Sequence, residues 1–226
     1  MRILRCLLIA MIALIPLPGI EAKAGEERLP VKRIPHAGNS LHDFLPPGWV
    51  VEEQAAGDLN GDGISDFAAI LVQGKPEFDK DGVMSERQRG LIFVVSHKKG
   101  FTLAGVNDDL LQCTTCGGVK EGVSITIRKG ILILSQLSGS REFTDDTWRF
   151  RYAPESRRFI LIGRDTESGD GMLGTGKIVS INYLTGSSVS ETYRHDAVGK
   201  RRITLSQKKG RVSRTTPFIE NVTAGD

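Results

Sequence analysis

One short segment, Gly-Asp-Leu-Asn-Gly-Asp-Gly-Ile-Ser-Asp-Phe, has the residue types and the spacing of a site for a hard cation. Counting Asp58 as the first position, oxygen-bearing side chains occupy the first, third, fifth and ninth positions, and glycine occupies the sixth. Calcium takes about six to eight oxygen ligands, with a backbone carbonyl from the seventh position and a glycine where the chain turns sharply. The pattern therefore predicts a calcium site formed by Asp58, Asn60, Asp62, Asp66 and the carbonyl of Ile64.

The residues after this loop exclude an EF-hand and indicate another kind of calcium loop. An EF-hand needs a bidentate glutamate at the twelfth position and a helix on each side. The twelfth position is Ala69, and residues 67–72 read as a buried strand. The segment resembles instead the calcium loops of FG-GAP and VCBS-type repeats, found in integrin α-subunit propellers and in many exported bacterial proteins. The resemblance covers residues 57–72 and implies ligation by the same five residues, although such repeats come in series and this chain has one good copy.

A metal-free turn rich in aspartate and asparagine is the alternative interpretation of the loop. Crowded acidic and amide oxygens repel one another unless an ion or solvent relieves the repulsion, which favours a bound ion. Because a core-like strand follows, the expected role of calcium is structural. A looser similarity to a group of uncharacterised exported bacterial proteins spans most of the chain and implies no activity; it rests on the order of residues 44–49, the Asp58 loop, residues 87–92 and residues 181–186.

Cys113 and Cys116 have the C-x-x-C spacing of a redox pair or of half a metal site. A redox-active pair needs a helix N-terminus to stabilise its thiolate, but Gly117 and Gly118 follow at once, where a helix would have to grow. A zinc site needs two more cysteine or histidine ligands, and the four histidines show no such spacing. The sequence predicts a structural disulfide between Cys113 and Cys116, with a thiol-disulfide oxidoreductase as the alternative.

Motifs of hydrolytic enzymes are absent from the sequence. It contains neither G-x-S-x-G nor H-E-x-x-H. Two kinds of site remain open, a carboxylate hydrolase and a carbohydrate-stacking surface, because sequence cannot show which side chains converge in space. The carboxylates considered are Glu142, Asp145, Asp146, Asp165 and Asp170, and the aromatic residues are Trp49, Trp148 and Tyr152, which core packing would also explain.

Residues 1–24 have the pattern of a secretory signal peptide. Arg2 and Arg5 precede an apolar run, and Ala-Lys-Ala closes the segment at Ala24. Removing it takes away three basic residues and one acidic residue, so the net charge falls from +3 to +1. A chain so near neutrality is not expected to bind nucleic acid. Because no later apolar stretch is long enough to span a bilayer, the expected destination is the periplasm or the extracellular space.

The rest of the chain, residues 25–226, is expected to form a single β-rich domain after an extended N-terminal segment at about residues 25–47. Short alternating or apolar runs predict an antiparallel meander of about a dozen strands. Turn residues between these runs predict hairpins, among them Lys129-Gly130, residues 153–156 and Lys208-Lys209-Gly210. Such a sheet must bury a face, which favours a sandwich or an open barrel, with a propeller-like arrangement as the alternative. The expected strands are residues 49–53, 67–73, 91–96, 101–106, 123–128, 131–136, 148–152, 159–163, 178–183, 188–193, 202–206 and 211–215.

Taken together, the sequence favours an exported, calcium-stabilised protein without enzymatic activity, in a binding or envelope role. Its ligand would be a protein or a carbohydrate. The runner-up is an exported enzyme, either a carboxylate hydrolase or a thiol-disulfide oxidoreductase.

Overall fold

A computed structural model describes residues 28–75, 78–119, 122–196, 198–199, 201–224 of the chain. The predicted signal peptide lies outside these residues. The described part is all-β, with twelve strands in two antiparallel sheets, as the sequence predicts. The sheets do not close into a barrel, and two packed layers correspond to a sandwich and not to the blades of a propeller. Within the described residues, no helix is long and apolar enough to cross a membrane.

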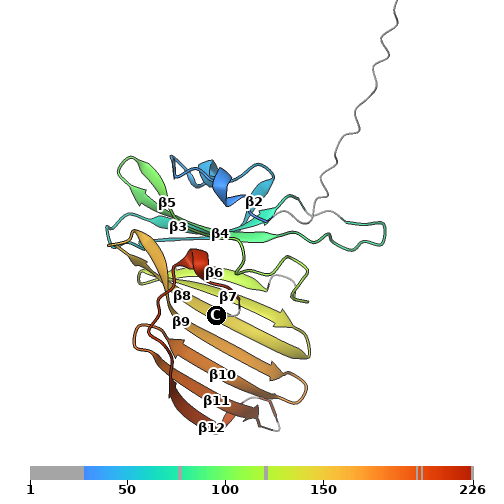
Figure 1. The fold of residues 1–226 in the computed structure, drawn as a ribbon. Coiled ribbons are helices and arrows are strands. Elements are labelled where there is room, and N and C mark those ends of the chain that lie inside the picture. The colour runs from blue at the N-terminus through green and yellow to red at the C-terminus, as the bar shows by residue number, and fades with distance from the viewer. Residues whose placement is uncertain (1–27, 76–77, 120–121, 197, 200, 225–226) are drawn as a thin grey trace, which may run out of the picture.

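The first sheet has five strands in the order β1-β5-β4-β3-β2 (Figure 1). Its central strands are almost wholly buried because runs such as Leu-Ile-Phe-Val-Val are apolar on both faces. The strands are β1 (Ala37–Gly38), β2 (Trp49–Gly57), β3 (Asp66–Gln73), β4 (Arg89–His97) and β5 (Gly100–Asn107).

The second sheet has seven strands that follow one another in sequence and in space. Tight turns at Lys129-Gly130 and after Ala153 join neighbouring strands, as turn chemistry predicts. Both turn residues of the first have positive φ, 51° and 71°. The strands are β6 (Val123–Arg128), β7 (Ile131–Gly139), β8 (Glu142–Ala153), β9 (Arg158–Asp170), β10 (Thr175–Asn182), β11 (Ser187–His195) and β12 (Arg202–Arg211).

The main core lies between one face of the five-stranded sheet and the β6–β9 half of the seven-stranded sheet. Phe93 of β4 packs against Phe150 of β8 and Phe159 of β9, with ring centroids 6.3 and 5.0 Å away. A short 3-10 helix, Ile219–Asn221, also brings Ile219 into this core. Both sheets therefore contribute to one hydrophobic core.

The N-terminal segment is more ordered than the sequence predicts. Two 3-10 helices, Val31–Arg33 and Leu41–Phe44, flank β1 and form part of the cover on the other face of the five-stranded sheet. Four apolar side chains of the segment are buried there with β3 and β4: Leu29, Ile34, Leu41 and Phe44. The local sequence pattern predicts only an extended chain here. The burial of these isolated apolar residues then fixes the path of that chain over the sheet.

The end of the second sheet corrects another expectation. The sequence predicts two strands there, with a turn at Lys208-Lys209-Gly210, but the structure has a single strand, β12, through these residues. Each of them pairs with β11, where Lys208 lies opposite Ser190 and Gly210 opposite Ser188. The ladder with β11 thus overrides the local turn preference of a lysine-glycine sequence.

Candidate functional site

The predicted calcium loop connects β2 to β3 at one end of the five-stranded sheet. The strands close with Gly57 opposite Asp66, so residues 58–65 form the loop. Gly61 and Gly63 have φ of +83° and +81°, a conformation that side chains with a Cβ rarely adopt. The two glycines let this short segment curl back on itself.

Asp58, Asn60 and Asp62 hold the curled loop together through their side-chain oxygens. The Asp58 carboxylate accepts the backbone N–H of Gly61 at 2.7 Å on one oxygen and that of Gly63 at 2.9 Å on the other. The Asn60 side-chain oxygen accepts the N–H of Asp62 at 2.9 Å. Each of these oxygens retains a second lone pair that an ion can use.

The remaining contacts of Asp62 complete this arrangement. One carboxylate oxygen accepts the backbone N–H of Ile64 at 2.8 Å, and the other accepts the side-chain amide of Asn60 at 3.1 Å. The Ile64 side chain is exposed. The structure therefore places Asn60 and Asp62 in direct contact beside Asp58.

Backbone hydrogen bonding keeps the first aspartate of the loop ionised. The N–H groups of Gly63 and Gly61 donate to the charged form and hold the pKa of Asp58 below its usual range. A calcium ligand must be deprotonated, and this shift extends the range of pH over which Asp58 is ionised to more acidic conditions.

Asp66, the fifth predicted ligand, has a different position and role. Its carboxylate is fully buried and accepts two hydrogen bonds on each oxygen. One oxygen accepts the N–H groups of Leu59 and Asn60 at 2.8 and 3.2 Å. The other accepts the N–H and the hydroxyl of Ser96 on β4 at 2.8 and 3.0 Å. These contacts anchor the loop to the core, and the Ser96 hydroxyl shares its single proton between Asp66 and the carbonyl of Ser65.

The carboxylates of the loop do not close on one point. Among the described residues, Glu86, Cys113 and Cys116 form the only group of three acidic, cysteine or histidine residues with ligand atoms within 4.8 Å of one another. An ion in the loop would be held by Asp58, Asn60, Asp62 and the carbonyl of Ile64, with water supplying further oxygens.

An open hollow of about 630 Å³ adjoins the loop. Asp58 and Asn60 line one side, and the β6–β7 turn with the end of β8 lines the other. Lys129 and Arg151 are exposed at this second side and form no ion pair with any described residue. The hollow is thus lined by one acidic and two basic side chains.

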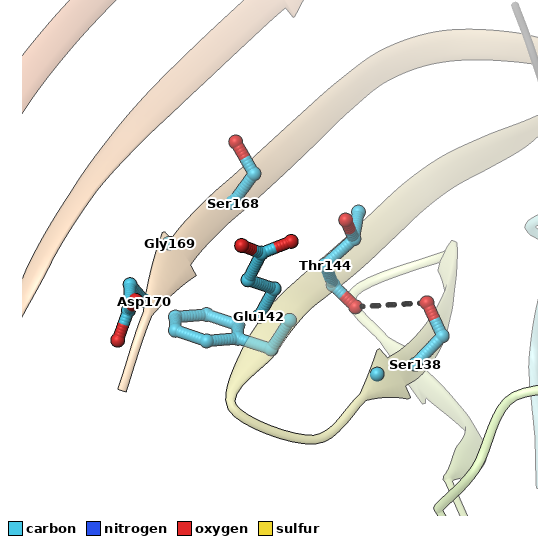
Figure 2. A pocket seen from close by; sticks show the side chains of 8 residues that line it. Ser138, Glu142, Thr144, Ser168, Gly169 and Asp170 are labelled. Atoms are coloured by element: carbon cyan, nitrogen blue, oxygen red, sulfur yellow. Dashed lines mark hydrogen bonds between the residues drawn. The ribbon is translucent and has the colours of Figure 1, made fainter. Parts of the chain in front are cut away.

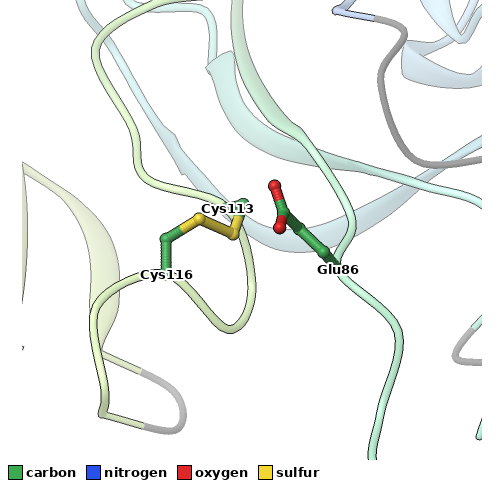
Figure 3. Close-up of side chains that lie close together, drawn as sticks. All are labelled: Glu86, Cys113 and Cys116. Atoms are coloured by element: carbon green, nitrogen blue, oxygen red, sulfur yellow. A yellow bond between two sulfur atoms is a disulfide. The ribbon is translucent and has the colours of Figure 1, made fainter.

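The two cysteines form the predicted disulfide (Figure 3). Cys113 is buried and Cys116 is exposed. The Arg89 guanidinium donates to the carbonyl oxygens of Gln112 and Cys113 at 3.2 Å each. It also forms a bidentate pair with Glu52 at 2.6 and 2.7 Å. The disulfide loop is thereby fixed to the first sheet.

This environment favours a structural disulfide over a redox-active one. No helix among the described residues adjoins Cys113, so the helix N-terminus that would stabilise a thiolate is missing there. The Glu86 carboxylate lies within 4.8 Å of both sulfur atoms, and a negative charge this close disfavours a thiolate. Sequence reasoning missed Arg89, whose only signal is a charge at the start of an apolar strand.

The carboxylates considered for hydrolysis lie on β8 and β9, and most are paired with arginine. Distances are 2.9 Å for Asp146 to Arg164, 2.6 Å for Asp165 to Arg149 and 2.9 Å for Asp170 to Arg141. Burial, followed by the nearby charges of Glu167 and Asp146, raises the pKa of Asp145. Since Asp145 and Asp146 are neighbours in a strand, they point to opposite faces.

Glu142 and Asp170 do share a hollow, of about 390 Å³, at the end of β7–β9 (Figure 2). Ser138, Thr144 and Ser168 line it as well. Asp170 accepts hydrogen bonds from the N–H of Leu173, the Arg141 guanidinium and the N–H of Met172, and these bonds lower its pKa. Asp170 therefore favours its ionised form and does not act as a proton donor beside Glu142.

The aromatic residues considered for carbohydrate stacking do not form an open surface. Trp148 is fully buried and Trp49 nearly so, in the two hydrophobic clusters on opposite faces of the five-stranded sheet. Tyr152 packs edge-on against Phe159 at 5.5 Å. Core packing accounts for all three.

Fold and site together define a two-sheet, disulfide-containing β protein with an anchored acidic loop. The chain matches no protein-family model, no curated protein and no solved structure.

Proposed function

We propose that this chain is an exported binding protein whose fold is stabilised by calcium held in the Asp58 loop. The observation that carries the proposal is the arrangement of Asp58, Asn60 and Asp62. Their oxygens are already fixed by backbone N–H groups within one short loop, and each keeps a lone pair for an ion. Fixed ligands lose little freedom when an ion binds, which favours affinity.

A structural role for the ion follows from where the loop is anchored. Asp66 ties the loop to Ser96 of β4, and Leu59 of the loop is itself buried in the main core. An ion that holds the loop therefore also holds the start of β3 against β4. The disulfide and the signal-peptide pattern support export, since disulfides persist in oxidising compartments.

The binding role is assigned to the hollow beside the loop. Its volume, about 630 Å³, lies in the range typical of sites for small ligands. Lys129 and Arg151 line it together with Asp58, whose negative charge calcium would neutralise. A ligand with an anionic group, carried by a protein or a carbohydrate, suits such a site.

The test compares thermal unfolding in millimolar calcium and in chelator, for the wild type and for Asp62→Ala. Calcium at a hundredfold excess over its dissociation constant adds about 2.7 kcal/mol of stability. For a chain of this size that raises the Tm by about 5–10 °C. Asp62→Ala should lose this rise, because it removes a ligand and leaves the glycine turns in place.

Asp79→Ala is the matched control. Asp79 is an exposed aspartate that accepts the N–H groups of Asp81 and Val83, as the loop aspartates do, but it lies beyond the other end of β3. Its calcium response should equal that of the wild type. Identical wild-type melts in the two conditions, with no heat of calcium binding by calorimetry, would contradict the proposal.

A further inference from the structure

The seven-stranded sheet extends well past the five-stranded sheet, so its last strands stand alone (Figure 1). Its buried apolar core side chains come mainly from β6–β9. Among the residues of β10–β12, only Tyr193 is buried. This part of the sheet is a single layer with two accessible faces.

Strand β12 is the free edge of this layer. It ends the strand order and pairs only with β11. All of its ten residues except Ile203 are exposed. After Arg211 the chain crosses the β10–β11 turn, where the N–H of Val212 and the Arg214 guanidinium donate to the carbonyls of Gly186 and Thr185. Within the described chain, nothing therefore pairs with the outer peptide groups of β12.

The free edge is regular and basic over its second half. A bulge interrupts the pairing near Thr192, and beyond it Ser206 to Arg211 pair with β11 without a shift. Lys208, Lys209 and Arg211 lie in this stretch and form no ion pair with any described residue. Residues 201–219 contain no aspartate or glutamate. The edge thus offers unpaired backbone groups together with unpaired positive charge.

We propose that the edge of β12 binds an acidic, extended segment of another protein, which adds to the sheet as an eighth strand. Main-chain hydrogen bonds to an exposed edge supply affinity, and side chains at alternate positions supply specificity. The same charges oppose a second copy of this chain, because an antiparallel β12–β12 pair would place lysine and arginine opposite one another. Charge complementarity therefore selects an acidic partner.

The alternation of side chains along β12 defines the pattern of that partner. Lys209 and Arg211 lie on one face of the sheet, and Lys208 lies on the other. Directly opposite residues on neighbouring strands are about 5 Å apart. The partner should therefore carry carboxylates on both faces of an extended segment of about six residues.

The experiment uses a fluorescent, end-capped octapeptide of threonine and glutamate with glutamates on both faces of its extended chain. Binding to the full chain is measured by anisotropy at low salt, where exposed charges are least screened. Lys208→Glu/Lys209→Glu should weaken binding at least tenfold. Lys98→Glu/Lys99→Glu makes the same charge change on the exposed β4–β5 turn of the other sheet and should leave binding unchanged.

A second pair of measurements separates strand addition from simple charge attraction. Methylating alternate backbone nitrogens of the octapeptide on its pairing edge removes its hydrogen bonds to β12 and should abolish binding at the same net charge. The unmodified peptide should slow hydrogen exchange of outward-facing β12 amides. Undetectable binding of the octapeptide, equal binding of the methylated form, or an equal loss in the two double variants would overturn the proposal.

Discussion

The most direct check on the anchoring of the loop is to remove the Asp66 carboxylate. Asp66→Ala deprives the backbone N–H groups of Leu59, Asn60 and Ser96 of their acceptor. Leu59 and Ser96 are buried, so water does not replace the carboxylate there, whereas the N–H of Asn60 is nearer solvent. The Ser96 hydroxyl retains a bond to the carbonyl of Ser65 at 2.8 Å. Two buried donors are therefore left without a partner.

The expected loss follows from that count. An unsatisfied buried donor costs about 1–3 kcal/mol, so Asp66→Ala should lower the free energy of unfolding by about 4 kcal/mol. This corresponds to a fall in Tm of about 8–16 °C for a chain of this size. Urea unfolding in chelator measures the loss without any contribution from calcium.

Two further variants make this result specific. Asp66→Asn keeps the shape of the side chain but places an amide donor against existing donors, so it should lose about half as much. Asp62→Asn, on the exposed part of the loop, should change stability in chelator very little. If Asp66→Ala unfolded within about 1 kcal/mol of the wild type, the four hydrogen bonds would not anchor the loop and the reasoning would fail.

Two other predictions concern the disulfide and a buried tyrosine. Replacing both Cys113 and Cys116 with serine should lower the free energy of unfolding by about 2 kcal/mol, because the closed loop is short, and should leave the far-UV circular dichroism unchanged. Alkylation of the denatured, unreduced wild type should find neither thiol free. Burial and, second, a hydrogen bond to Glu167 raise the pKa of Tyr193 to about 12. Ultraviolet titration should therefore show one tyrosine ionising near pH 12, and at lower pH in the Glu167→Gln variant. Since the pKa in the unfolded chain is about 10, this contribution to stability should be complete below pH 10 and lost as the pH rises to about 12.

Local sequence patterns identified most of the strands and turns of this protein. The alternation of apolar and basic residues around Trp148 predicts a strand with one buried face, and β8 has that pattern. Lys129-Gly130 predicts a tight turn, and both residues have positive φ. These features depend on a residue and its near neighbours, which a sequence displays directly.

Tertiary structure decided which contacts each aspartate of the acidic loop makes. Asp58 and Asp66 belong to one motif and look equivalent as ligands. Asp66 is buried because β4 brings Ser96, 30 residues further along, next to its carboxylate, while Asp58 finds its partners within the loop. Spacing in the sequence reports which residues are near one another along the chain, but not which distant donor reaches them.

The same limit explains the buried ion pair and the free edge. Arg89 pairs with Glu52, which is 37 residues away in the sequence, because their strands β4 and β2 flank β3 in the same sheet. Lys208 and Lys209 form part of a strand because β11 provides a ladder for them, against their local preference for a turn. The sequence by itself determined most of the strands, most of their turns and the residue types available for binding. The tertiary structure alone decided which of these residues are buried, paired or left at an edge, because those outcomes depend on contacts between segments far apart in the chain.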